Sequence, residues 1–224
     1  MSLVFDEIIV VGDMPELRDL AWEWGFVVAC DIFSGAGVLG GIHAGLVVSR
    51  TFYSFVVGCD MPFLSVELMR YMRDIVDADQ GTGPVEPRSG FHKICMSSLR
   101  RHDIVIPQVG SFIEPLHAVY ARNCITPIEE TISRGELRVA SILSKVYTLY
   151  LKGEVIRRFD PDGLSFFNVN TGEDLARAAE LVGENGLREM GGDEGLLGVG
   201  PLSPLRALNA QKPLPPLRAL NDQI

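Results

Sequence analysis

The sequence predicts an α/β fold of three layers, in which a Rossmann-like, mostly parallel sheet carries helices on both faces. Two observations favour this class. Short apolar runs rich in β-branched residues alternate along the chain with segments of helical periodicity. The alternation has the spacing of strand–helix–strand units, which place successive strands in one sheet. We expect this α/β domain to span residues 1–183.

The first three strand–helix units follow from local patterns. We predict strands at residues 7–11, 26–30 and 52–58, and helices at residues 15–24, 40–50 and 65–78. Gly25 has the place of a C-cap at the end of the first helix. Ser65 is the predicted N-cap of the third helix, whose apolar residues recur on one face (Leu68, Met69, Met72, Ile75 and Val76).

The second half of the domain is less regular. Glycines and prolines make residues 79–101 an irregular insertion, and loops of this length are either functional or mobile. Beyond the insertion we predict strands at residues 103–106, 146–151 and 155–156, and helices at residues 116–134 and 173–181.

Residues 184–224 form a Pro- and Leu-rich tail whose composition differs sharply from that of the domain. The segment 201–209 recurs at 213–221, and two copies are too few to build a solenoid. We expect a disordered tail, although Pro-x-x-Pro spacing also suits a groove-binding partner.

Composition restricts the partners of the protein. A hydrophobic fraction of 47% allows a sizeable core, while a net charge of −9 disfavours binding to nucleic acid or to an anionic membrane. A nucleotide stays possible, because one phosphate site needs only backbone N–H groups and one or two cations. The four cysteines are widely spaced, and no apolar run reaches the length of about 18 residues that a membrane helix needs. We therefore expect reduced thiols and a cytoplasmic location.

Ligands of open parallel sheets bind beyond the carboxyl ends of the strands, and a Gly-rich loop at residues 31–42 has that position. Glycines allow the backbone to approach a ligand, and the following helix offers unpaired N–H donors to an anion. The same composition also occurs in ordinary turns.

Asp60 follows the third predicted strand, and Pro62 prevents a helix from starting at once. A carboxylate in this place can bind a Mg²⁺ ion that bridges nucleotide phosphates. The alternative, that Asp60 caps the next turn, is weaker because Ser65 is available as the helix cap. Asp60 is therefore the first candidate for a metal ligand and catalytic residue.

Asn168 and Asn170 alternate with apolar residues, so their amides point to the same side. Thr171 is a predicted N-cap that precedes two acidic residues in the first helical turn. Two amides on one face can bind a base or sugar, but Asn also stabilises turns locally. The residues alone leave both alternatives open.

Four segments together resemble, in order, the motifs of the molybdenum cofactor guanylyltransferases, which belong to the nucleotidyltransferases with a Rossmann-like fold. They are GVLGGI at residues 37–42, VGCDMPF at 57–63, EPLHAVY at 114–120 and NVNTGEDL at 168–175. The resemblance covers about residues 5–181, and it implies transfer of GMP from GTP to molybdopterin-bound molybdenum with release of pyrophosphate.

The resemblance also implies roles for single residues. The guanosine part of GTP would contact Asp31 and the loop residues Gly37, Leu39, Gly40 and Gly41, and Asp60 would hold Mg²⁺. Pro115, Leu116, Asn168 and Asn170 would line the side of the molybdopterin cofactor. Such a transfer depends on positioning and charge neutralisation and needs no protein nucleophile. Molybdoenzymes or other cofactor-biosynthesis proteins would be further partners.

Two departures from the family pattern matter. Val38 stands where family members have Pro, and the resemblance begins only at the family's second strand. We therefore expect this chain to lack the family's first strand and its Gly-rich phosphate loop with the following Lys. Two alternatives to transfer of GMP follow: a non-catalytic protein that binds the cofactor, or a nucleotidyltransferase that uses CTP or a sugar phosphate.

Overall fold

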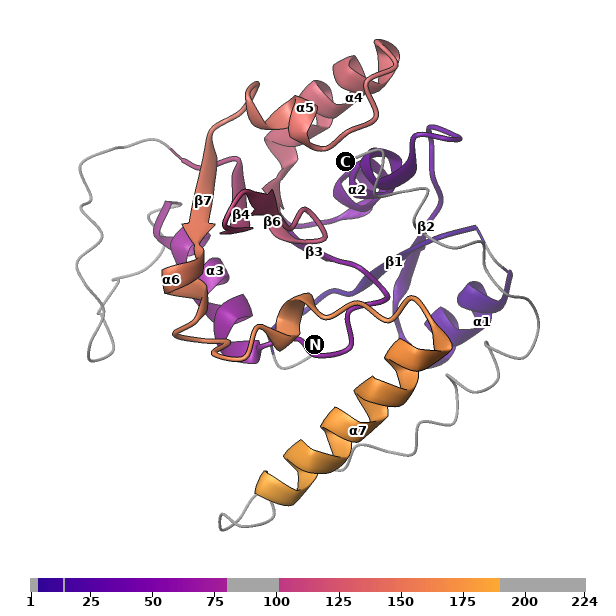
Figure 1. The fold of residues 1–224 in the computed structure, drawn as a ribbon. Coiled ribbons are helices and arrows are strands. Elements are labelled where there is room, and N and C mark those ends of the chain that lie inside the picture. The colour runs from indigo at the N-terminus through magenta and orange to yellow at the C-terminus, as the bar shows by residue number, and fades with distance from the viewer. Residues whose placement is uncertain (1–3, 14, 80–100, 190–224) are drawn as a thin grey trace. The chain divides into compact units, whose positions relative to one another are not determined.

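The computed structural model describes residues 4–13, 15–79 and 101–189 (Figure 1). The predictions for residues 80–100 and for the tail beyond residue 189 lie outside the described residues. The chain divides into two compact units, of which the first ends at Phe167 and the second begins at Asn168. No helix in the described ranges is long and apolar enough to cross a membrane.

A mixed sheet forms the centre of the first unit. Its strands have the order β3 (Tyr53–Val57), β6 (His117–Ala121), β4 (Ile104–Val109) and β7 (Thr148–Lys152). Strands β4 and β7 are parallel, and β6 runs antiparallel to both β3 and β4. The carboxyl ends of β3, β4 and β7 therefore lie at one edge of the sheet, which is where ligands of α/β proteins bind.

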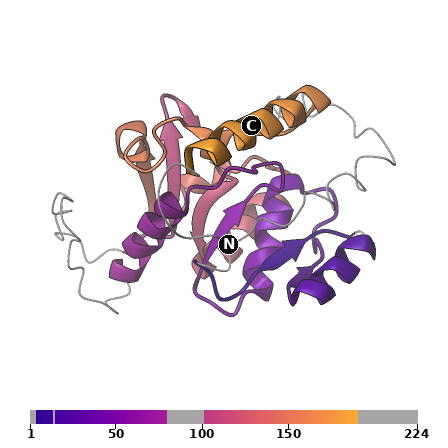
Figure 2. The same cartoon turned by 90° about the horizontal axis from the view of Figure 1, so that it is seen from below.

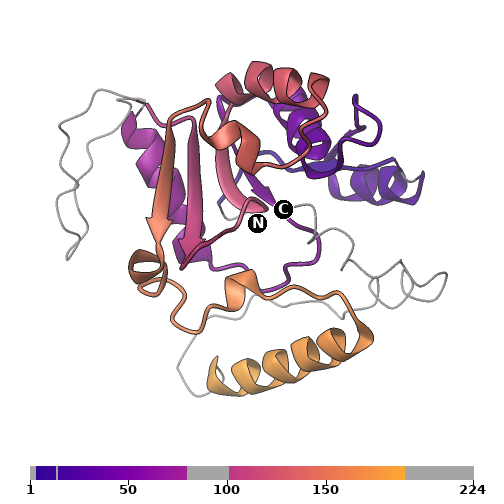
Figure 3. The ribbon, with the colours of Figure 1, turned by 45° about the horizontal axis from the view of Figure 1, so that its top comes forward.

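Helices cover both faces of this sheet, which confirms the predicted class. On one face, α2 (Gly37–Val48), α4 (Ile125–Ser133) and α5 (Ala140–Leu143) pack against the inward side chains of β4 and β6, and Figure 3 shows α2 and α4 over the same part of the sheet. On the other face, α3 (Val66–Asp79) and α6 (Gly153–Ile156) bury a second cluster. Successive residues of β4 enter the two clusters alternately, as expected for a strand buried on both faces.

A smaller parallel sheet pairs β1 (Ile9–Val11) with β2 (Val27–Ala29), and α1 (Pro15–Trp24) connects them. Helix α2 contacts this small sheet as well as β3, and Figure 2 shows the small sheet beside α1 and α2. Within the described part of the chain, β1 is not hydrogen-bonded to β3.

The predicted helix at residues 116–134 is wrong in its first half. Residues His117–Ala121 form the buried strand β6, the short 3-10 helix Arg122–Cys124 (η1) follows, and only Ile125–Ser133 is helical as α4. All five residues of β6 are buried, so its sequence lacks the apolar–polar alternation that marks a half-exposed strand. The strand also makes the sheet mixed, because β6 is antiparallel to both of its neighbours.

The predicted strand at residues 155–156 is also wrong, because these residues end helix α6. Three short elements were not predicted, and one of them is helix α5. Strand β5 (Phe112–Ile113) forms a hairpin with β4 through Gly110, whose φ of 62° suits a tight hairpin turn. A 3-10 helix, η2 (Leu164–Phe166), follows α6.

The described part of the second unit ends with helix α7 (Gly172–Glu189). Its predicted N-cap is confirmed, because the Thr171 hydroxyl accepts the Asp174 N–H at 3.1 Å. The Asp174 carboxylate in turn accepts the Thr171 hydroxyl at 2.8 Å and the backbone N–H groups of Asn170 and Thr171. These hydrogen bonds, the one from the Thr171 hydroxyl above all, hold the pKa of Asp174 below its ordinary value.

Candidate active site

The carboxylate of Asp60 lies directly over Gly58, one residue beyond the carboxyl end of β3. A Cβ atom on Gly58 would stand 2.5 Å from Oδ1 of Asp60, which is closer than real Cβ contacts. The turn is closed by the Met61 N–H, which donates to the Gly58 carbonyl at 3.3 Å. Glycine at position 58 therefore allows the tight turn that holds this carboxylate at the sheet edge.

The same turn contacts the start of β6. The Gly58 N–H donates to the Leu116 carbonyl at 3.0 Å, and the Cβ of Leu116 lies 3.7 Å from the position of a Cβ on Gly58. Pro115, which precedes Leu116, is buried, and its carbonyl accepts the Tyr120 hydroxyl at 2.8 Å. Two predicted site segments, one around Asp60 and one at 115–116, are thus joined by backbone pairing.

Asp60 is partly exposed and free to take a ligand. Among the described residues neither of its oxygens has a hydrogen-bond or ion-pair partner, and no group of three His, Cys, Asp or Glu residues could bind a metal alone. Mg²⁺ commonly takes one or two carboxylates and completes its shell with phosphate oxygens and water. A single free carboxylate at the sheet edge is therefore a suitable ligand for Mg²⁺.

The Asp60 charge also acts on its neighbour Cys59. Loss of solvent around the sulfur, and then the Asp60 carboxylate, raise the pKa of the Cys59 thiol above its ordinary value. The thiol is therefore protonated at neutral pH and is a poor nucleophile.

The Gly-rich loop folds against the start of α2. A Cβ on Gly40 would lie 3.1 Å from Cβ of Ala36, 3.3 Å from the Phe33 carbonyl oxygen and 3.6 Å from Oδ1 of Asp31. The structure thus brings together Asp31 and Gly40, two of the residues predicted to bind the nucleotide. Asp31 itself is exposed and available to a ligand.

The start of α2 has free backbone donors. Its N-cap residue, Ala36, has no side-chain hydrogen bond to the helix, and no acidic side chain lies in the first turn. Gly37 has a φ of 56°, which favours glycine, while the side chain of Leu39 is fully buried in the core. Leu39 can therefore meet a ligand only through its backbone, and the first turn of α2 is a place for an anionic or polar group.

His117 is a packing residue in this structure. Its ring is fully buried between Phe55 and Phe166, with both ring centroids 5.1 Å away, and neither ring nitrogen has a hydrogen-bond partner. Burial lowers the pKa of His117 to about 4, although the Asp160 carboxylate acts in the opposite direction. A neutral, enclosed imidazole is badly placed to act as a general base.

The predicted residues thus form separate groups. Asp60 and Leu116 meet through Gly58, and Asp31 meets Gly40, but no hydrogen bond or ion pair within the described ranges joins the two groups. Asn168 and Asn170 belong to the second compact unit, where the backbone N–H of Asn170 is bound by Asp174.

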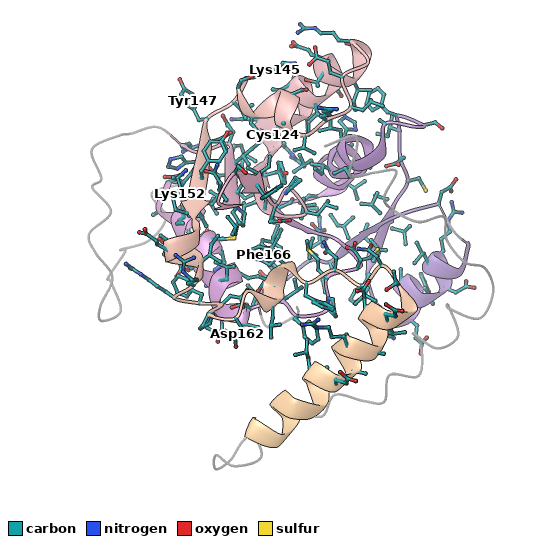
Figure 4. The ribbon with its side chains drawn as sticks, viewed as in Figure 1. Cys124, Lys145, Tyr147, Lys152, Asp162 and Phe166 are labelled. Atoms are coloured by element: carbon teal, nitrogen blue, oxygen red, sulfur yellow. The ribbon has the colours of Figure 1, made fainter. Side chains whose placement is uncertain are left out.

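Sequence reasoning missed a cavity of about 410 Å³ at the same edge of the sheet. It is lined by the hairpin β4–β5, by α6 and by the segment that follows α6, and Figure 4 labels Asp162 and Phe166 on that segment. Glu114 faces the cavity from the motif 114–120, two residues before Leu116. The only indication of this cavity in the sequence was an acidic residue, Glu114, directly before Pro115 and Leu116.

Comparisons with known proteins agree with this arrangement. Residues 1–148 match the family described as MobA-like NTP transferase domain. A molybdenum cofactor guanylyltransferase of Syntrophotalea carbinolica is 32% identical over 79% of this chain and 73% of its own length. A protein of Peptoclostridium acidaminophilum, named probable molybdenum cofactor guanylyltransferase, is 31% identical over 82% of this chain and 75% of its own.

A solved structure gives the same result. The molybdopterin-guanine dinucleotide biosynthesis protein A of Archaeoglobus fulgidus superposes with a TM-score of 0.60 at 26% identity, over 79% of this chain and 78% of its own. Fold and sequence together define a nucleotidyltransferase with a MobA-like domain. Within that class, the chain belongs to the molybdenum cofactor guanylyltransferase family.

Proposed function

We propose that this protein transfers GMP from GTP to molybdopterin-bound molybdenum and releases pyrophosphate. An oxygen of the acceptor forms a bond to the α-phosphorus, and the bond from that phosphorus to the oxygen that bridges it to the β-phosphorus breaks. The observation that supports this best is the free Asp60 carboxylate, which lies over Gly58 at the ligand-binding edge of the sheet, where Gly58 pairs with Leu116. Such a reaction depends mainly on positioning and charge neutralisation.

The loop at residues 31–41 serves the nucleotide in this proposal. Guanine presents two adjacent N–H donors on its Watson–Crick edge, and the exposed Asp31 carboxylate can accept both. The backbone of Gly37, Leu39, Gly40 and Gly41 approaches the guanosine closely, because three of these residues are glycines and the side chain of Leu39 points to the core.

Asp60 would hold Mg²⁺, whose charge neutralises phosphate oxygens when it is bound. The protein's own contribution is to present the carboxylate without a competing cation, since no ion pair of Asp60 exists in the described part of the chain. The Cys59 thiol beside it, whose pKa is raised by loss of solvent and by the Asp60 carboxylate, is a poor nucleophile.

We propose that Pro115, Leu116, Asn168 and Asn170 contact the acceptor, as the resemblance to the family motifs implies. Molybdoenzymes or other proteins of cofactor biosynthesis would receive the product. We also propose a cytoplasmic location, where GTP is available.

The test is a transfer assay with GTP labelled at the α-phosphorus, Mg²⁺ and molybdopterin-bound molybdenum. We expect label in a pterin dinucleotide and one pyrophosphate per transfer. Parallel reactions with labelled CTP, or with a sugar phosphate in place of the pterin, test the other nucleotidyltransferase activities. Binding of the molybdopterin species without any transfer would instead indicate a non-catalytic cofactor-binding protein.

A further inference from the structure

The cavity beside the motif 114–120 has the size and composition of a ligand site. Its volume of about 410 Å³ falls in the range of small-molecule sites, and its walls are mainly apolar. Phe112 in β5 is 75% exposed and Phe166 lies on the opposite segment, so an aromatic ring in the cavity would cover apolar surface that water now contacts.

Glu114 is the unusual polar group of this cavity. The residue is half-buried, yet its carboxylate has no hydrogen-bond or ion-pair partner among the described residues. Burial raises the pKa of Glu114, and no neighbouring charge lowers it. A partly desolvated carboxylate without a donor gains from each hydrogen bond that it accepts, so it is suited to accept hydrogen bonds from a ligand.

The other charged groups of the cavity differ from Glu114 in their hydrogen bonds, their exposure or their charge. Both Asp160 oxygens accept backbone N–H groups, from Leu164 at 3.0 Å and from Ser165 at 2.8 Å. Asp162 is exposed, and Arg157 is the single basic residue among those that line the cavity. Three carboxylates against one guanidinium disfavour a triphosphate and favour a ring with N–H donors.

The position of Glu114 relates the cavity to Asp60. The Glu114 carbonyl accepts the His117 N–H at 3.1 Å, which closes a turn through Pro115 and Leu116. The Leu116 carbonyl accepts the Gly58 N–H, and the Asp60 carboxylate lies over Gly58. The short segment 114–116 therefore has the cavity at one end and the Asp60 turn at the other.

We propose that Glu114 determines specificity for the acceptor by accepting two hydrogen bonds, from the 2-amino group and the neighbouring ring N–H of a pterin held in this cavity. These two donors lie side by side on one edge of the ring, which matches the two oxygens of a carboxylate. Phe112 and Phe166 supply the apolar contact to the ring. This inference rests on the proposed function, since it names how the acceptor of that reaction is recognised.

The test uses the intrinsic fluorescence of pterin and of lumazine, in which an oxygen replaces the 2-amino group. Wild-type full-length protein should bind pterin roughly 10- to 100-fold more tightly than lumazine, because the lumazine oxygen faces the carboxylate and leaves it without a donor. In Glu114→Gln the side-chain amide can donate to that oxygen, so the preference should fall to about twofold or reverse.

Two matched variants separate recognition from packing. Phe112→Ala should weaken both ligands equally and leave the preference intact, because the ring contact is common to them. Glu130→Gln, at an exposed position of α4 outside the cavity, should leave both affinities and the preference unchanged. Circular dichroism and thermal unfolding verify that each variant is folded.

A Glu114→Gln variant with the wild-type preference would overturn the assignment, and so would a wild-type protein that binds neither ring up to millimolar concentration. The transfer assay is independent of both results. Transfer of GMP without pterin selectivity at Glu114 would refute this inference alone, whereas selective pterin binding without transfer would refute the proposed function alone.

Discussion

Oδ1 of Asp60 occupies the space that a side chain on Gly58 would need, with only 2.5 Å between this oxygen and the position of the missing Cβ. The candidate metal ligand therefore lies over Gly58, whose backbone N–H pairs the end of β3 with the start of β6. A side chain at position 58 would therefore displace the carboxylate, although the glycine contributes no chemical group of its own.

Gly58→Ala should displace the Asp60 carboxylate and reduce the transfer rate by roughly a hundredfold, as misplacement of a reacting group by about 1 Å can do. Unfolding should shift little, because the side chain that must move is short and partly exposed. Transfer kinetics and thermal unfolding measure the two effects. Gly183→Ala is the control, since nothing lies within 4 Å of a Cβ there; equal rates in both variants would contradict the role of Gly58.

Gly40→Ala should raise the KM for GTP about tenfold, which corresponds to about 1.4 kcal/mol of binding free energy. The new methyl group would press on Ala36 and on the Phe33 carbonyl and so push the loop away from the start of α2. Gly45→Ala is the control on the same helix, where the nearest atom is at an ordinary 3.6 Å. A KM that stays at the wild-type value in Gly40→Ala would show that the loop does not meet the nucleotide.

The thiol of Cys59 should report the charge of Asp60. Because the carboxylate helps to raise the pKa of Cys59, Asp60→Asn should lower that pKa and shift the pH profile of alkylation to lower pH. Addition of Mg²⁺ with GTP should act in the same direction in the wild-type chain, as it neutralises the same charge. The measurement needs a background in which Cys30 and Cys95 are replaced by Ser; an unchanged profile in Asp60→Asn would contradict the coupling.

His117 should make the protein sensitive to acid. In the folded state its pKa is about 4, while the unfolded chain has the ordinary value of 6.5. Between these values the unfolded state binds a proton that the folded state excludes, so the free energy of unfolding falls as pH drops from 6.5 to 4. The loss should be about 3 kcal/mol for this residue.

Urea unfolding of wild type and His117→Leu at several pH values measures this contribution. The variant should lose much of the slope between pH 4 and 6.5, and it can also gain stability at neutral pH, because two buried nitrogens without partners are removed. Parallel slopes in the two proteins would show that His117 is not buried in its neutral form.

Local signals were sufficient for most of the fold. Ser65 and the apolar face that follows it predict α3, and the Ser65 hydroxyl accepts the Leu68 N–H at 3.1 Å as an N-cap should. Strand β6 could not be recognised, because burial on both faces removes the alternation that distinguishes a strand from a helix. Strand β5 has only two residues, too few for any periodicity.

The site was predictable only in part. Asp60 follows from its place after an apolar run, and the loop glycines follow from their clustering. The contact of Gly58 with Asp60 depends on a turn geometry that no pattern of residue types determines. The cavity at Glu114 is formed by segments from residues 109 to 166 that meet only in the folded chain.

In the proposed reaction, transfer of GMP depends on the Asp60 carboxylate. The most direct measurement is the transfer rate of Asp60→Asn at saturating GTP and Mg²⁺, with Asp74→Asn on the exposed side of α3 as a control of equal charge. We predict a loss of roughly 100- to 1000-fold in Asp60→Asn, the usual effect of removing one group that stabilises transition-state charge, and an unchanged rate in the control. A folded Asp60→Asn variant that transfers GMP within a fewfold of the wild-type rate would contradict the account.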